Sequence, residues 1–254
     1  WVVDMYRYVI EHPIWIPPDT LAKLDPRAGS AMGRIYRIFP DTRPARKPLK
    51  ITSLQGEQLT AAMDSPNGTQ RDLIQQQIEW NQDRAAVPAL KEIAQGSPRP
   101  EVRIQALSTW ANLETPSVEA LQILLRDPDP HVRRHAVRIS ESQLQTSPQL
   151  AGAVIALATD IDATVRMQVA YSSAFLKPAD SAKSLSVMFA KSGEVAHLKS
   201  AEESALTAEN IMPILSDLKK IAAKGDGTDR LLVNAATLAD AQSMQTILTE
   251  LAAF

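Results

Sequence analysis

Three stretches of the sequence decide the fold, because they repeat one another: PRPEVRIQAL at 98–107, PDPHVRRHAV at 128–137 and IDATVRMQVA at 161–170. Each contains a Val-Arg pair, followed three residues later by Ala or Val, and the arginines are 30 and 33 residues apart: Arg103, Arg133 and Arg166. Steps of 31 to 33 residues outward reach three further basic residues: Arg71, Lys199 and Arg230. A period near 32 residues predicts an array of similar helical units.

Each unit is predicted to contain two helices. Between the basic residues lie apolar segments with helical spacing: VPALKEIA (87–94), VEALQILLRD (118–127), LAGAVIALAT (150–159), AKSLSVMFAK (182–191) and IMPILSDLKKIAA (211–223). Four residues before the basic residue, four of the six units hold an Asn or Asp that suits a helix N-cap: Asn67, Asp129, Asp162 and Asp226. Arg99 and Val195 occupy this position in the other two units and cannot cap.

This pattern resembles HEAT repeats, an α-solenoid family in which an Asp, a Pro and a Val-Arg pair recur at the start of the second helix. Two pairs, each six residues apart, match the family's Asp and Arg: Asp127 with Arg133, and Asp160 with Arg166. Ser97 stands where the family has Asp before Arg103. The resemblance implies an all-α, HEAT-like α-solenoid of about six helix pairs over residues 51–254, in which stacked units share one core. We expect six residues of this core to be buried: Val102, Ala106, Val132, Ala136, Val165 and Val169.

The first 50 residues differ in composition. They hold six of the chain's twelve Trp, Tyr and Phe residues and a net charge of +4, against −6 for residues 51–254. β-Branched and aromatic residues predict strands at 1–10 and 33–40, joined through the extended segment HPIWIPP and a short helix over 20–24 capped by Asp19. Because two strands alone are marginally stable, residues 1–42 indicate a β-rich remnant of an upstream domain. Residues 43–50 follow as a linker.

Longer strings carry a second resemblance: VVDMYRYVIEHPIWIPP, GRIYRIFP and LQGEQLTAAMDSPNG. They are similar to the junction in a planctomycete-type family of large membrane-bound dehydrogenases, which run from a β-propeller through HEAT repeats to a cytochrome c domain. The resemblance implies that residues 1–42 are the tail of the propeller, that the parent protein is periplasmic or exported, and that haem c belongs to another part of it. A chain that starts at Trp1 is interpreted as a fragment. The chain has no cysteine, so no CxxCH haem attachment lies within it and we expect no cofactor here.

Two histidines are the candidate metal ligands. His131 and His135 are four residues apart on one predicted helix, a spacing at which two imidazoles share a metal ion, and Asp127 and Asp129 precede them. No third ligand is fixed by the spacing, so the favoured interpretation is a polar flank beside Val132 and Ala136. Glu202 and Glu203 are interpreted as a solvated helix face, and Trp80 and Trp110 as core residues.

The periodic charges allow two interpretations. The recurring arginines are Arg71, Arg103, Arg133, Arg166 and Arg230. They could form a phosphate-binding stripe, called here the phosphate-reading stripe, or a structural ladder between repeats in which they pair with residues such as Asp127 and Asp160. The ladder is favoured because a net-acidic array repels polyanions, and we expect each guanidinium to meet an acidic residue of the preceding turn. Nucleic acid is therefore not an expected partner. The longest apolar run, 151–158, is too short to span a membrane.

The sequence favours a non-catalytic repeat scaffold and interaction module that binds protein partners or neighbouring domains of the same polypeptide. The alternative is a HEAT-like enzyme or ligand-binding solenoid with a site on its concave face, similar to phycobilin lyases or DNA glycosylases. A polar pocket with a free carboxylate favours the lyase, and a basic groove with tryptophans favours the glycosylase.

Overall fold

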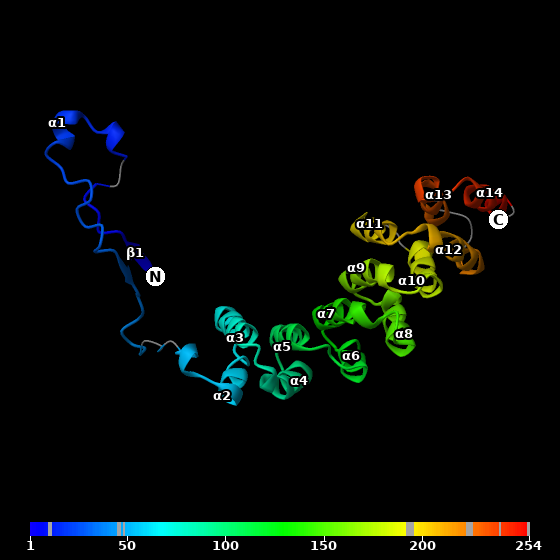
Figure 1. The fold of residues 1–254 in the computed structure, drawn as a ribbon, viewed down its shortest axis with the longest axis horizontal. Helices are drawn as coiled ribbons and strands as arrows, with labels where there is room; N and C mark the ends of the chain where they lie inside the picture. The colour runs from blue at the N-terminus through cyan, green and yellow to red at the C-terminus, as the bar shows by residue number, and fades with distance from the viewer. Residues whose placement is uncertain are drawn as a thin grey trace. The chain divides into compact units, whose positions relative to one another are not determined.

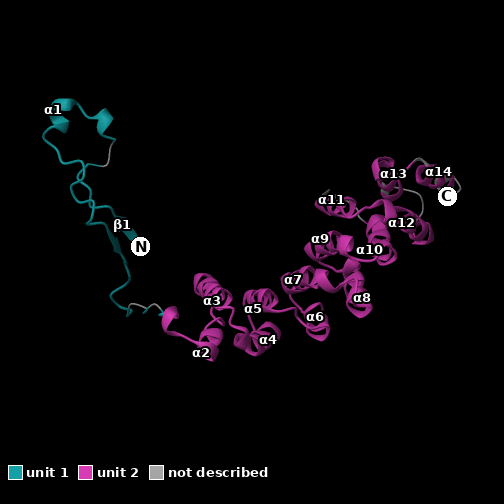
Figure 2. Ribbon diagram, in the orientation of Figure 1, with its two compact units in different colours: residues 1–50 teal, residues 51–254 magenta. Residues whose placement is uncertain are grey.

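The computed structural model describes residues 1–9, 12–44, 47, 49–191, 196–221, 226–238 and 240–252. The chain divides into two compact units, unit 1 at residues 1–50 and unit 2 at residues 51–254 (Figure 2). Unit 1 contains a small sheet and short helical turns, whereas unit 2 is helical throughout its described residues.

Unit 1 is built on a two-stranded antiparallel sheet. Strand β1 (Val2–Asp4) pairs with β2 (Arg34–Tyr36), and Val3 lies opposite Ile35. Both strands are shorter than predicted. Strand β1 ends because the chain turns at Tyr6, which has a positive φ of 49° and donates its backbone N–H to Asp4 Oδ1 over 2.8 Å.

The segment between the strands corrects two predictions. HPIWIPP is not extended throughout, because Pro13–Trp15 form a 3-10 turn in which the backbone N–H of Ile14 donates to His12 Nδ1. Helix α1 (Pro18–Leu21) begins before Asp19, which lies in its first turn instead of capping it. The proline at the first helical position explains the earlier start, since its fixed φ is already helical and its missing N–H leaves no bond unmade.

Unit 2 is the predicted all-α helical repeat, with short 3-10 turns between some of its helices (Figure 1). Its helices are α2 (Gly56–Ala61), α3 (Gly68–Trp80), α4 (Val87–Gly96), α5 (Pro100–Leu113), α6 (Val118–Leu124), α7 (Pro130–Ser140), α8 (Pro148–Ala156), α9 (Ala163–Ser172), α10 (Pro178–Lys191), α11 (Ala196–Ser204), α12 (Ala208–Ile221), α13 (Asp226–Leu238) and α14 (Ala241–Ala252). No helix in the described part of the chain is long and apolar enough to cross a membrane.

The helices of unit 2 stack in two rows. Helices α3, α5, α7, α9 and α11 each pack on the next and form what we call the second-helix row. Helices α4, α6, α8 and α10 pack in the same order and form the first-helix row, and pairs such as α4 with α5 and α6 with α7 join the rows (Figure 1). Each helix is therefore covered by its own partner and by the neighbouring units, as in other repeat arrays.

Capping residues start the second helices where the sequence predicts. Asn67, Asp129 and Asp162 each accept a hydrogen bond from a backbone N–H in the first turn of α3, α7 and α9. Arg99 occupies the N-cap of α5 without a side-chain capping bond, and its backbone N–H donates to Ser97 Oγ. Asp226 is the first residue of α13. Val195 lies outside the described residues.

The core contains the residues that the repeat predicts. All six are fully buried at 0% exposure: Val102, Ala106, Val132, Ala136, Val165 and Val169. Trp110 is also buried, at 2%, but Trp80 is 76% exposed, so the prediction for Trp80 was wrong. Trp80 is the last residue of α3, where the helix ends and the neighbouring units no longer cover it.

Among the described residues, the buried apolar side chains form two clusters rather than the one core predicted. One cluster runs from Leu59 to Ala201 and the other from Ala182 to Ile247, and both include residues of α10. Buried polar groups lie near this helix: Ser173 Oγ is 3.1 Å from Ser184 Oγ, and Asn210 Nδ2 donates to Ser181 Oγ over 3.1 Å. Hydroxyls and an amide thus contribute polar contacts to the packing around α10.

Candidate functional site: an arginine ladder and a polar pocket

The first complete rung of the ladder joins α5 to the turn before α7. Arg103 Nε and NH2 donate to the two carboxylate oxygens of Asp127, over 2.9 and 2.7 Å. The third guanidinium nitrogen, NH1, donates to the carbonyl oxygen of Ser97 over 2.8 Å. The exposed fractions of the Arg103 and Asp127 side chains are 9% and 8%. This is a buried, bidentate ion pair between successive repeats, the strongest form of charge-assisted hydrogen bonding.

The next rung repeats this geometry one unit later. Arg133 Nε and NH2 donate to the carboxylate of Asp160, both over 2.8 Å, and NH1 donates to the carbonyl oxygens of Asp127 and Pro128. The hydrogen bond with Asp160 raises the pKa of Arg133 above its ordinary value, although burial opposes the shift. The carboxylate of Asp160 also accepts the backbone N–H of Asp162, so one Asp fixes its own turn and the preceding arginine.

These contacts revise the predicted pairing. In four repeats the arginine NH1 donates to the carbonyl oxygen six residues earlier, over 2.6 to 2.8 Å: Arg71 to Ser65, Arg103 to Ser97, Arg133 to Asp127 and Arg166 to Asp160. In these repeats the preceding turn therefore supplies a backbone oxygen, and for Arg103 and Arg133 the carboxylate comes from the following unit. The reason is that a guanidinium carries five N–H donors in a fixed fork, so Nε and NH2 bind a carboxylate while NH1 binds a carbonyl oxygen.

The ladder is chemically different at its ends. Arg71 Nε donates to the amide oxygen of Gln105 over 3.2 Å instead of a carboxylate. Arg230 donates to Glu203 over 2.7 Å and to Glu202 over 2.9 Å, and its guanidinium lies 4.7 Å from the centre of the Phe189 ring. Glu202 is 0% exposed, so the predicted solvated face was wrong for this residue.

A polar network between α3 and α5 was not predicted. Gln105 Nε2 donates to Asp72 over 2.9 Å and to Gln75 over 2.7 Å, while Asn112 Nδ2 donates to Glu79 over 2.8 Å. The only sequence signal is that the donors and acceptors are 30 to 33 residues apart, the repeat period. These side chains link the two helices, and Gln105 joins the network to the ladder by accepting from Arg71.

The two candidate metal ligands lie on one side of α7. His131 is exposed and His135 is partly buried. Burial lowers the pKa of His135 below its ordinary value, and the nearby charges of Arg134 and Arg138 act in the same direction. Asp129 is already engaged as the N-cap of α7. Within the described residues, no group of three or more His, Asp and Glu side chains is placed to hold a metal ion.

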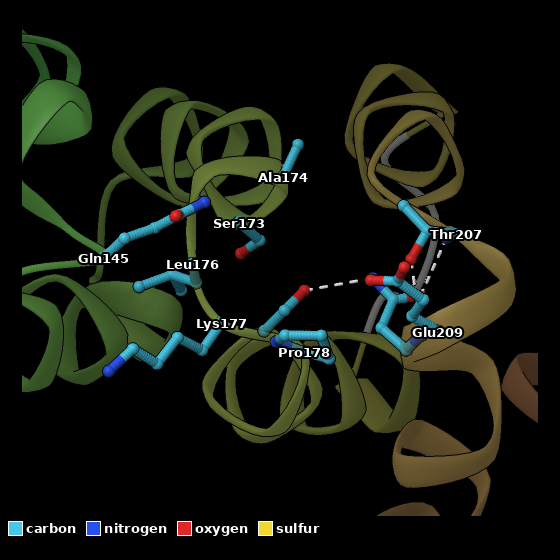
Figure 3. A pocket seen from close by; sticks show the side chains of 10 residues that line it. Gln145, Ser173, Ala174, Leu176, Lys177, Pro178, Thr207 and Glu209 are labelled. Atoms are coloured by element: carbon cyan, nitrogen blue, oxygen red, sulfur yellow. Dashed lines mark hydrogen bonds between the residues drawn. The ribbon is translucent and has the colours of Figure 1, made fainter.

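A pocket of about 310 Å³ opens beside the N-termini of α10 and α12. Figure 3 shows Ser173 and Leu176 facing Thr207 and Glu209 across it, with Lys177 at one side. Thr207 and Asn210 form a capping box at the start of α12, in which each side chain accepts the other's backbone N–H. Among the described lining residues, Lys177 and Glu209 carry charge and no histidine is present to activate a serine. The pocket is polar, and its hydroxyls and amide serve the helix ends.

Comparison with known proteins bears on unit 1 alone. A family described as a domain of unknown function, DUF7133, matches residues 1–42. No curated protein matches the chain.

Proposed function

We propose that this chain is a repeat scaffold and interaction module, without catalytic chemistry of its own, that holds neighbouring domains or protein partners at fixed positions. One observation carries the proposal: Arg103 with Asp127 and Arg133 with Asp160 form largely buried bidentate ion pairs between successive units. A repeat array that relied on apolar contacts alone would tolerate small sliding movements between units. A fork-shaped donor on a carboxylate fixes their distance and register.

A measurement of spacing tests the scaffold. The chain has no cysteine, so spin labels can be attached at two introduced cysteines, Lys91→Cys on α4 and Lys177→Cys before α10, both at exposed positions. We expect one narrow distribution of distances between the labels. Adding Arg133→Ala to this double variant is expected to broaden the distribution, whereas Arg126→Ala at an exposed position is the matched control. A broad distribution in the unaltered array would contradict the scaffold.

We further propose that unit 1 belongs to a larger β-domain, as in the tail of a propeller of the dehydrogenase family described above. Large apolar side chains of unit 1 are open to solvent, among them Trp1 at 81%, Trp15 at 78% and Ile38 at 76% exposure. Strands β1 and β2 form a sheet of two strands, which is marginal by itself. A partner sheet would cover these side chains and pair with the free strand edges.

The coding sequence on either side tests this second part. It is expected to encode strand-rich repeats upstream and a CxxCH motif downstream, which would supply covalently bound haem from a separate module. Flanking sequence without either feature would contradict the family proposal and leave the spacing experiment unaffected.

A further inference from the structure

The side chains around the ladder on α7 differ from those on its neighbours. One position after the ladder arginine, helices α3, α5, α7 and α9 carry Asp72, Ile104, Arg134 and Met167. Five positions after it, they carry Gln76, Ser108, Arg138 and Tyr171. A cation occurs at these two positions on α7 only. His131 lies three residues before Arg134, and His135 lies three residues before Arg138 and four after His131. All four side chains therefore share one face of the helix.

The two guanidiniums of this face are not engaged by carboxylates of the described residues as the ladder arginine is. Arg133, one residue away, is fully engaged by Asp160 and Asp127. In contrast, neither Arg134 nor Arg138 makes a side-chain hydrogen bond or ion pair with any residue that the structure describes. Like charges four residues apart on a helix repel each other, and these two lie in a unit of net charge −6.

Two acidic groups close to this face, Asp162 and Glu141, serve other contacts. Asp162 caps α9 and accepts from Thr164 and Val165. Glu141, at the end of α7, accepts from Ser172 over 2.7 Å and from Gln168 over 3.2 Å. These two carboxylates are thereby engaged by hydroxyl, amide and backbone donors. The charges of Arg134 and Arg138 therefore indicate a partner from outside the chain.

We propose that the α7 face, defined by His131, Arg134, His135 and Arg138, binds a short acidic segment of a partner protein through two carboxylates. The side chains at i and i+4 start about 5 to 6 Å apart, a spacing that suits two carboxylates on one peptide, and each guanidinium matches a carboxylate bidentately. Tyr171, 45% exposed on α9, offers a ring beside the face for an apolar residue of the same segment.

Charge complementarity favours a short acidic peptide over a nucleic acid. At the two positions compared, positive charge occurs on α7 alone, whereas Asp72 and Glu79 lie on α3 and Glu101 on α5. A nucleic acid tracking along the row would meet these carboxylates, while a peptide a few residues long would meet α7 alone. This inference rests on the scaffold proposal, because it names the chemistry of one partner that the scaffold would hold.

The experiment uses the intact chain and a fluorescein-labelled hexaglutamate peptide. Wild type is expected to bind the peptide, and Arg134→Glu with Arg138→Glu to weaken binding about tenfold or more. The matched control, Lys91→Glu with Arg126→Glu, makes the same charge change at exposed positions on the first-helix side of the array and is expected to change binding less than about twofold. The NMR resonances of the His131 and His135 ring protons are expected to change chemical shift during titration with the peptide.

Three results would overturn the proposal. They are equal weakening in the two double variants, no binding of hexaglutamate at millimolar concentration, and tighter binding of a ten-nucleotide oligothymidylate than of the peptide. If the charge reversal unfolds the protein, Arg134→Gln with Arg138→Gln replaces it. Failure here is distinguishable from failure of the scaffold, because the distance between spin labels is measured without any peptide.

Discussion

Arg133 and Asp160 are 27 residues apart in the sequence, yet the guanidinium of one and the carboxylate of the other share two parallel hydrogen bonds of 2.8 Å. Their side chains are only 13% and 6% exposed. The pair lies where the second-helix row meets the turn of the next unit. The pair therefore fixes the register between two repeats. Its loss is expected to destabilise the packing of the whole array and not only α7.

Replacing Arg133 with Ala is expected to lower the free energy of unfolding by about 1 to 3 kcal/mol, because Asp160 would remain buried without its charged donor. Arg138→Ala on the same helix removes an exposed guanidinium and is expected to change stability by less than about 0.5 kcal/mol. Thermal and urea unfolding of both variants measures the difference. Unaltered unfolding of Arg133→Ala, combined with lost heparin binding, would contradict the structural ladder and favour the phosphate-reading stripe.

Periodicity in the sequence predicted the helices and the buried positions because both are local. Val132, the valine of the Val-Arg pair, and Ala136 lie four residues apart on one face of the helix, and Asp129 satisfies backbone donors two and three residues on. Such contacts span less than one helical turn, so the spacing of residue types reports them directly. Because the units have similar sequences, the same local contacts recur in each of them.

The partners of the charged residues were not predictable in the same way. Spacing placed Asp127 six residues before Arg133, but it did not reveal which oxygen of Asp127 faces the guanidinium. The burial of Glu202 depends on Arg230, 28 residues later, and on how α11 and α13 pack. Long-range contacts of this kind require the stacking geometry, which the sequence pattern alone does not contain.

Substitution of the buried Trp110 and the exposed Trp80 tests which of the two contributes to the core of unit 2. Trp110→Ala is expected to destabilise unit 2 by about 3 to 5 kcal/mol, because it removes a large buried side chain and leaves a cavity. Trp80→Ala is expected to change stability by less than about 0.5 kcal/mol, since its ring is open to solvent. Urea unfolding followed by circular dichroism measures both. Equal losses would mean that Trp80 is covered in solution.

The cap of α9 predicts a pH dependence with a definite sign. Thr164 Oγ1 donates to Asp162 Oδ1 over 2.6 Å, and this hydrogen bond, joined by the backbone N–H groups of Thr164 and Val165, lowers the pKa of the Asp162 carboxyl below its usual value. A carboxyl with a lowered pKa in the folded state stabilises the protein above its unfolded pKa, about 3.9. That contribution is lost as the pH falls through the folded pKa.

Asp162→Ala is therefore expected to lower the free energy of unfolding by about 1 kcal/mol near pH 7, the usual effect of losing a helix N-cap. The difference from wild type should shrink as the pH falls below about 4, because protonation weakens the acceptor in wild type while the alanine has nothing to titrate. Asp162→Asn keeps a capping oxygen without a titrating group, so its stability relative to Asp162→Ala should not follow this carboxyl. Urea unfolding of the three proteins between neutral pH and pH 3 measures the effect. A difference between wild type and Asp162→Ala that stays constant or grows toward acid would contradict the assigned role of the carboxylate.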